Sequence, residues 1–103
     1  MRFWLHIVLL AGAAIAANAV AQQYPARPVR IYIPFTAGSA ADIIARALEP
    51  QMREKLGQSL IIDNRGGAGG NIAAELTAKS PADGYSVMMG TVGTHAINYS
   101  LYS

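Results

Sequence analysis

Apolar and polar residues follow one another along this chain in an order that predicts three strands and two helices. Val29–Ile33 alternates and is rich in β-branched and aromatic side chains, which is typical of a strand. The runs Leu60–Asp63 and Tyr85–Met89 share that character and predict a second and a third strand. Helical spacing of apolar residues predicts a helix after each of the first two strands, over Asp42–Leu56 and Ile72–Ala78.

The first predicted helix is amphipathic. Ile44, Leu48 and Met52 follow one another at four-residue spacing and form its apolar side, which we expect to face a core. Gly57 predicts the end of the helix, because glycine readily adopts the left-handed conformation of a C-terminal cap. Pro50 removes one backbone hydrogen bond inside the helix, at a cost of roughly 3 kcal/mol. We therefore expect a kink or a break at Pro50.

Strands that alternate with helices predict the α/β class, here a βαβαβ unit with a parallel sheet and right-handed crossovers. The loops that follow the three strands then lie at the carboxyl ends of the strands. Open α/β sheets bind their ligands at this edge.

Each of these three loops is built from small, uncharged residues. The sequence N-R-G-G-A-G-G-N at Asn64–Asn71 precedes a predicted helix, and similar loops occupy Phe35–Asp42 and Gly90–His95. Glycine permits positive φ and lets another molecule approach the backbone amides, while a helix N-terminus attracts anions. The sequence therefore predicts a site for a small anion. The alternative, a flexible connector, is the ordinary interpretation of a single glycine-rich loop.

The first 21 residues predict a signal peptide. Arg2 supplies a positive start, Phe3–Ala17 is almost wholly apolar, and Ala19-Val20-Ala21 offers the small residues that signal peptidase accepts. We expect cleavage after Ala21 and export to the periplasm. A membrane anchor is the competing interpretation, but the apolar stretch is shorter than the roughly 20 residues that a spanning helix needs.

Composition excludes several classes of function. The chain has 8 basic and 6 acidic side chains, so it is almost neutral once Arg2 is removed, and no basic patch with interleaved aromatic residues predicts nucleic-acid binding. With 0 cysteines it can form no disulfide and carry no lipoprotein anchor. His95 is the only histidine after the signal peptide, and the carboxylates are spread singly. We therefore predict no metal site and no cofactor.

Two enzyme interpretations compete with the binding site. Gly67–Ile72 matches only the first two glycines of a dinucleotide-binding fingerprint, and no G-K-[ST] follows, so a nucleotide enzyme is poorly supported. Ser39, Asp42 and His95 offer the residue types of a catalytic triad but lack the G-x-S-x-G turn that exposes a nucleophile. We therefore expect a protein that is not an enzyme.

Five motifs in order resemble those of the tripartite tricarboxylate transporter receptor family, the Bug-type extracytoplasmic solute receptors. They are Y-P-A-R-P-V-R, a P-F-T-A-G-S-A-A-D loop, D-N-R-G-G-A-G-G-N, A-D-G-Y and T-V-G-T-H-A-I-N-Y-S-L-Y, at Tyr24–Arg30, Pro34–Asp42, Asp63–Asn71, Ala82–Tyr85 and Thr91–Tyr102. The family more often has glycine at Ser39 and threonine at Ala41, which leaves the ligand's identity open.

The resemblance implies a two-lobed type II periplasmic binding protein that holds a small carboxylate and delivers it to the membrane subunits of a transporter. Residues 22–103 would form part of its N-terminal lobe, without the second lobe. Arg65 would be structural or lie at the rim. The ligand-binding residues that it implies are Thr36, Ala37, Gly38, Ser39, Asp42, Ala68, Gly69, Gly70, Asn71, Thr91, Gly93, Thr94 and His95. Three hypotheses remain: a solute receptor, an exported fragment that binds nothing, and a nucleotide-binding α/β enzyme.

Overall fold

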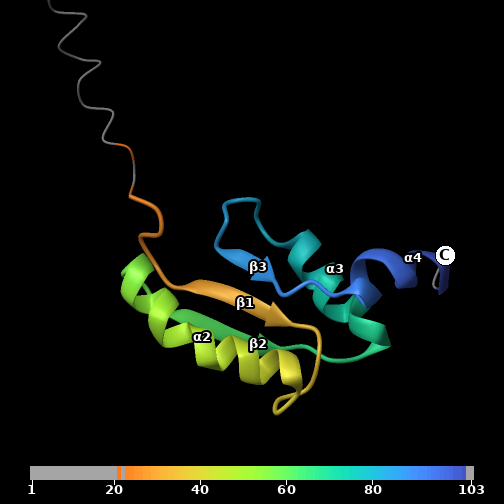
Figure 1. Ribbon diagram of the computed structural model, residues 1–103. Helices are drawn as coiled ribbons and strands as arrows, with labels where there is room; N and C mark the ends of the chain where they lie inside the picture. Colours follow the sequence, from red (N-terminus) through yellow and green to blue (C-terminus); the bar gives the residue numbers. More distant parts are fainter. Residues whose placement is uncertain (1–20, 22, 102–103) are drawn as a thin grey trace, which may run out of the picture.

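The computed structural model describes residue 21 and residues 23–101, which form a three-stranded sheet with helices packed against it (Figure 1). The strands are β1 (Val29–Ile33), β2 (Leu60–Asn64) and β3 (Ser86–Met88), in the spatial order β2-β1-β3. Both neighbours pair with β1 in parallel. The predicted α/β class and parallel sheet are thus confirmed. The predicted signal peptide lies outside the described residues except for Ala21.

Three helices and two short helical turns complete the part of the chain that the structure describes. Their bounds are Ala40–Leu56 for α2, Asn71–Lys79 for α3, Asn98–Leu101 for α4, Ala68–Gly70 for the 3₁₀ turn η1 and Gly93–Ile97 for the π-helical turn η2. The turn η2 differs from the sequence prediction, which placed a loop at Gly90–His95, and α4 was not predicted. No helix within the described part of the chain is long and apolar enough to cross a membrane.

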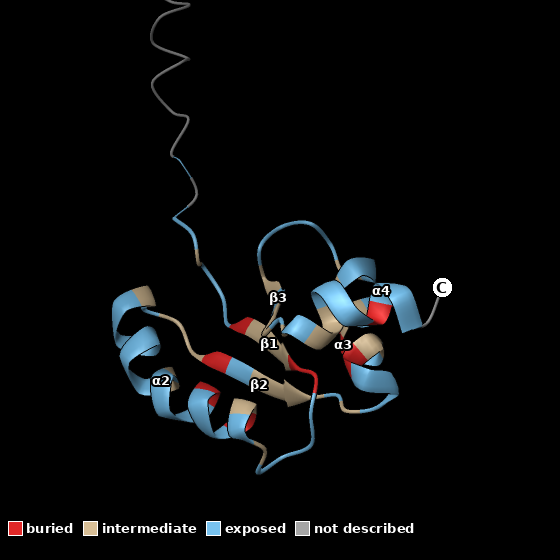
Figure 2. Cartoon of the chain, turned by 45° about the vertical axis from the view of Figure 1, so that its right-hand side comes forward, coloured by how far each residue is buried: buried red, intermediate tan, exposed pale blue. Residues whose placement is uncertain are grey.

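The strand order places the two crossover helices on opposite faces of the sheet. The connection from β1 to β2 moves to one side, and the connection from β2 to β3 passes back over β1, so right-handed crossovers put α2 and α3 on different faces. Figure 2 shows α2 on one face of the strands and α3 with α4 on the other. The loops after β1 and β3 therefore leave the sheet toward opposite faces, and open α/β sheets bind ligands at such a switch point.

Helix α2 begins and ends as its sequence predicts, but it does not break. Ser39 caps its start by accepting a hydrogen bond from the N–H of Asp42, and Gly57 caps its end with φ of 69°. The helix continues through Pro50, whose ring lies on an exposed position. A break at Pro50 is therefore wrong, because the loss of one hydrogen bond at an exposed turn is tolerated within this 17-residue helix, and a kink there stays a prediction.

The face that α2 turns toward the sheet also differs from the prediction. Asp42 and Ala45 are buried, whereas Ile44, Leu48 and Met52 are 53%, 45% and 37% exposed. The small side chain of Ala45 lies against the sheet, while the predicted apolar side stays partly exposed. A core of few residues results, and Figure 2 shows the buried positions close to the strands. The buried apolar residues are Val29, Ile33, Pro34, Ala45, Leu60 and Ala73.

A cluster of side chains, here called the amino-end clasp, joins the segment before β1 to the turn before β3. It consists of Tyr24, Arg27, Asp83 and Tyr85. The two tyrosine rings meet edge to face at 5.1 Å, and the guanidinium of Arg27 lies 4.0 Å from the ring centre of Tyr85. Arg27 also pairs with Asp83 at 3.0 Å. The motifs Y-P-A-R and A-D-G-Y therefore contact one another, on the side of the sheet away from the glycine-rich loops.

Candidate functional site

The three predicted loops lie where the topology requires, at the carboxyl ends of β1, β2 and β3. The loop after β1 leads into α2, the loop after β2 forms η1 and leads into α3, and the loop after β3 leads into η2. In Figure 1 the second and third loops lie on the α3 side of the strands, and the first turns toward α2. The loops thus lie at the carboxyl edge of the sheet and cover both of its faces there.

The second loop contains four consecutive residues with positive φ. The values are 118° at Gly67, 48° at Ala68, 64° at Gly69 and 94° at Gly70. Alanine in this conformation costs about 1–2 kcal/mol, so only a glycine-rich sequence adopts such a turn readily. The N–H of Gly70 donates to the carbonyl of Gly67 at 2.9 Å, and the N–H of Asn71 donates to the carbonyl of Ala68.

These internal hydrogen bonds determine which donors the turn presents. In a trans peptide the C=O and the following N–H point in opposite directions. The carbonyls of Gly67 and Ala68 point toward the turn that follows, so the next N–H groups, those of Ala68 and Gly69, point away from it. Neither N–H has a hydrogen-bond partner among the described residues. Two adjacent free N–H groups at a helix start form a concave donor pair that suits an anion.

The first loop uses most of its predicted donors internally. Gly38 N–H donates to the Oδ2 of Asp42 at 2.9 Å, and Asp42 N–H donates to the Oγ of Ser39 at 3.3 Å. Ser39 N–H donates to the carbonyl of Thr36 at 3.2 Å. Within the part of the chain that the structure describes, the N–H groups of Thr36 and Ala37 have no such partner. These two amides are therefore the donors that this loop offers.

Asp42 braces the first loop and presents no donor of its own. Its buried carboxylate accepts hydrogen bonds from Gly38 N–H and, at 3.0 and 3.1 Å, from Arg46 Nε. These two partners, Gly38 first, hold the pKa of the Asp42 carboxyl below its usual value. Arg46 also donates to Asn64 Oδ1 at 3.4 Å, and Asn64 in turn donates to the carbonyl of Phe35 at 3.2 Å. This network fixes the loop to the end of β2.

The third loop is closed by two threonines. Thr91 N–H donates to Thr94 Oγ1 at 3.0 Å, and Thr94 N–H donates to Thr91 Oγ1 at 3.3 Å. His95 N–H donates to the carbonyl of Thr91 at 3.1 Å, and the Nδ1 of His95 lies 2.7 Å from Thr94 Oγ1. Val92 and Gly93 keep N–H groups without a partner among the described residues. Val92 was not among the predicted site residues. It contributes a backbone N–H, and its apolar side chain does not indicate such a role in the sequence.

Close backbone contacts bring the loops together. A Cβ on Gly70 would lie 2.5 Å from Thr94 Cγ2 and 3.1 Å from Pro34 Cβ, so the second loop packs directly on the third and on the end of β1. A Cβ on Gly66 would lie 3.2 Å from the backbone nitrogen of Thr36. The second loop therefore touches both of the others, and glycine is required at Gly70 for that approach.

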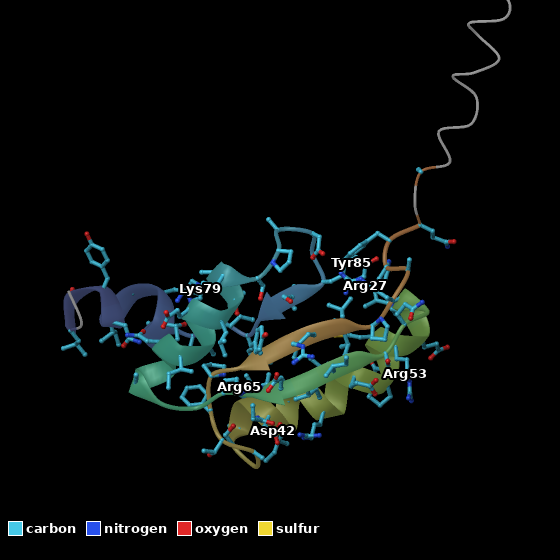
Figure 3. The ribbon with its side chains drawn as sticks, turned by 180° about the vertical axis from the view of Figure 1, so that it is seen from behind. Arg27, Asp42, Arg53, Arg65, Lys79 and Tyr85 are labelled. Atoms are coloured by element: carbon cyan, nitrogen blue, oxygen red, sulfur yellow. The ribbon has the colours of Figure 1, made fainter. Side chains whose placement is uncertain are left out.

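The positive side chains nearest the loops are paired with carboxylates. Arg65 Nε donates to Asp63 Oδ1 at 2.8 Å, and Arg30 lies 2.7 Å from the other oxygen of Asp63. The Arg65 guanidinium, followed by Arg30, holds the pKa of the Asp63 carboxyl below its usual range. Figure 3 shows Arg65 and Asp42 near the glycine-rich loops and Arg27 with Tyr85 near the other end of the strands. The loops therefore offer an anion neutral amides rather than free cations.

The described residues hold no group of three histidine, cysteine, aspartate or glutamate side chains that could bind a metal ion. Open α/β sheets bind ligands at the carboxyl ends of their strands, and the uncharged N–H donors here lie at that edge.

Comparison with known proteins identifies the class of protein. The family profile described as tripartite tricarboxylate transporter family receptor matches residues 44–102. The chain belongs to this family of receptors. It is a family of binding proteins, not of enzymes, and the nucleotide-enzyme hypothesis is thereby set aside.

The relatives cover most of this chain. Protein BugT of Bordetella pertussis is 44% identical over 82 residues, which are 80% of this chain and 25% of BugT. An R. palustris protein solved with adipate is 49% identical, with a TM-score of 0.68 over 71% of this chain and 24% of its own. MatC from Rhodopseudomonas palustris, solved with bound malate, is 36% identical, with a TM-score of 0.73 over 78% and 27%. This chain thus spans about a quarter of the length of its relatives.

Proposed function

We propose that this chain forms part of the N-terminal lobe of a periplasmic receptor that captures a small carboxylate and delivers it to the membrane subunits of a tripartite tricarboxylate transporter. The observation that carries the proposal is the set of unpartnered N–H groups, two in each of the three loops at the carboxyl edge of the described sheet. Relatives solved with adipate and with malate support a carboxylate as the ligand. These N–H groups belong to Thr36, Ala37, Ala68, Gly69, Val92 and Gly93.

A carboxylate suits such donors for a physical reason. Hydrogen bonds from neutral N–H groups to an ionised oxygen are roughly twice as strong as those between neutral groups. They also act without a buried cation, which would have to lose its own water. The predicted residues Gly38, Ser39, Asp42, Thr91 and Thr94 support this site by fixing the loops, rather than by donating to the ligand.

We expect the chain on its own to bind no carboxylate with measurable affinity. The described residues leave large apolar side chains exposed on α2 and around α4, among them Ile43 at 61% and Leu101 at 69%. A lobe in this state has little to exclude water from a ligand, and ordinary ligand sites bury most of the ligand's surface.

A chimera tests the proposal in a complete receptor. In it, residues 23–101 of this chain replace the matching segment of the R. palustris relative that was solved with adipate. Calorimetry of this chimera against adipate, malate and acetate should give binding to at least one dicarboxylate within about tenfold of the parent's affinity, a difference of about 1.4 kcal/mol. A chimera that melts cooperatively and binds none of them would contradict the proposal.

Export is a separate part of the proposed function. The sequence of residues 1–21 predicts removal of the signal peptide after Ala21 and release into the periplasm. N-terminal sequencing of the periplasmic protein should begin at Gln22. Soluble protein that retains Met1 would contradict it.

A further inference from the structure

Asn98 connects the second and third loops through a side chain that is nearly buried. The residue is 8% exposed and lies at the start of α4, directly after η2. Its Nδ2 donates to the carbonyl of Gly69 at 2.9 Å and to the Oδ1 of Asn71 at 2.7 Å. In the sequence, Asn98 lies within the motif at Thr91–Tyr102 and begins an N-Y-S glycosylation motif, and neither pattern predicts a contact with the second loop. The two hydrogen bonds give it a different role.

We propose that Asn98 is a positioning residue that sets the orientation of the Asn71 side chain, so that Asn71 presents its amino group to the carboxylate ligand. This inference rests on the proposed function, because it assigns Asn71 a donor role in that same site. It adds one side-chain donor to the backbone donors of the three loops.

The chemistry of the two carboxamides determines the orientation. Both partners of Asn98, the Gly69 carbonyl and Asn71 Oδ1, are acceptors, so only the Nδ2 of Asn98 can satisfy them, and it spends both of its hydrogens in doing so. With its Oδ1 engaged, Asn71 has its Nδ2 free, and that group has no partner among the described residues. The Nδ2 of Asn71 therefore points away from Asn98. A carboxylate oxygen can accept a hydrogen bond from this group.

The hydrogen bond from Asn98 to the Gly69 carbonyl also restrains the second loop, which its glycines would otherwise leave flexible. Residues with positive φ in series have many alternative conformations, and glycine loses more backbone entropy on folding than any other residue. A hydrogen bond from Asn98 to the Gly69 carbonyl holds the peptide that follows the free N–H of Gly69. The described residues offer this carbonyl no second side-chain donor. Asn98 thus orders the backbone donors as well as the Asn71 side chain.

Asn98→Asp is the sharpest test, because aspartate has the same shape but no amino group. The substituted carboxylate would place oxygens against the Gly69 carbonyl and Asn71 Oδ1, and Asn71 would turn over to donate to it. The Oδ1 of Asn71 would then face the ligand and repel it. In the chimera we expect Asn98→Asp to weaken adipate binding by about tenfold more than Asn98→Ala does, since a hydrogen bond to a charged group is lost and a repulsion replaces it.

Asn71→Asp separates the two roles. It keeps an acceptor for Asn98 but removes the donor toward the ligand, so adipate affinity should fall about tenfold or more while the melting temperature stays close to that of the unsubstituted chimera. Tyr99→Phe, at an 84% exposed neighbour, is the matched control and should change neither quantity.

A spectroscopic measurement distinguishes failure of this inference from failure of the proposed function. The side-chain NH₂ resonances of Asn71 and Asn98 can be followed by NMR in the chimera without ligand. We expect the NH₂ hydrogens of Asn98 to exchange slowly with solvent and those of Asn71 to exchange fast. In Asn98→Asp the NH₂ hydrogens of Asn71 should exchange slowly. If Asn71 does not change, or if affinity falls only in proportion to stability in both Asn98 variants, the positioning role is overturned. If these signals change as expected but no carboxylate binds, the proposed function fails instead.

Discussion

At the amino ends of the strands, side chains hold the structure together, whereas at the carboxyl ends close backbone contacts at glycine join the loops and side chains such as Asp42 and Asn98 brace them. In the amino-end clasp, the ring of Tyr85 meets that of Tyr24 edge to face and lies under Arg27, and its hydroxyl accepts a hydrogen bond from the N–H of Ala26 at 2.8 Å. At the other end, glycines allow the second loop to touch Pro34 and Thr94 with no side chain between them. Figure 3 shows the two ends separated along the length of the strands.

The contrast indicates that the motifs of the clasp stabilise the fold and that the glycine-rich motifs form the candidate site. Side-chain contacts in the clasp satisfy one another and leave few donors for a ligand. The glycine-rich loops satisfy their carbonyls internally and leave pairs of N–H groups free among the described residues. Substitutions in the clasp should therefore change stability alone. Substitutions in the loops should change stability, binding, or both, according to which atoms they displace.

Gly70→Ala should have the strongest effect of all, on stability. Its φ is 94°, and the new Cβ would lie 2.5 Å from Thr94 Cγ2, so strain and overpacking act together. We expect the chimera to lose about 3 kcal/mol in its free energy of unfolding, measured in urea.

Gly38→Ala is the matched control for that substitution. Its φ is 84°, but a Cβ there has nothing within 4 Å, so only backbone strain of about 1–2 kcal/mol remains. Equal losses in the two variants would show that the second and third loops do not pack as closely as the structure has them.

Gly69→Val should act mainly on binding. Gly69 has φ of 64° and one of the free N–H groups, and a β-branched side chain there both disfavours this conformation and blocks the ligand. We expect a loss of roughly 1–3 kcal/mol in the free energy of binding by calorimetry. His95→Ala should cost less, because its side chain bonds to Thr94 within the loop. Unchanged affinity in Gly69→Val would refute the amide site.

Much of the fold could be predicted from the sequence, because strand alternation and turn residues act locally. Val29–Ile33 matches its predicted bounds, and Gly57 ends α2 as predicted. The orientation of α2 could not be predicted, because Arg46 binds both the buried Asp42 and Asn64 on β2, and a spacing rule for apolar residues ignores such polar contacts. The helical turn at Gly93 was also missed, since glycine and threonine have low helix propensity.

The candidate site shows the same division. The loops were predicted because glycine marks close backbone approach, and their convergence follows from the parallel topology. Which amides remain free could not be predicted, because it depends on hydrogen bonds between residues within each turn. Asn98 was missed for a further reason: its partners lie 29 and 27 residues away along the chain.

Tyr85→Phe tests whether a substitution in the clasp changes stability without changing binding. It removes only the hydroxyl that accepts the hydrogen bond from Ala26 N–H and leaves the ring contacts in place. The expected loss is about 1 kcal/mol in the free energy of unfolding. Adipate affinity should remain unchanged in calorimetry at the same temperature. A clear loss of affinity would show that the clasp is coupled to the site.

The weakest effect that we expect concerns pH. The hydrogen bond from Gly38 N–H and the Arg46 guanidinium lower the pKa of Asp42 in the folded protein. A lowered folded pKa stabilises the protein above the unfolded pKa of about 3.9, and this stabilisation is lost as the pH falls below that value. Between pH 7 and pH 3, Asp42→Asn should therefore lose less unfolding free energy than the unsubstituted chimera. Asp63 titrates in both proteins, so an identical loss would show that Asp42 contributes nothing.

An NMR titration of the ¹⁵N-labelled chimera with adipate asks whether the free amides of the loops bind the carboxylate. We expect the amide signals of Thr36, Ala37, Ala68, Gly69, Val92 and Gly93 to shift together along one saturating curve. The amide signals of Ala26 and Tyr85 in and beside the clasp should stay in place. Saturating shifts that are confined to the clasp, or that leave Ala68 and Gly69 unchanged, would contradict binding of the carboxylate by these amides.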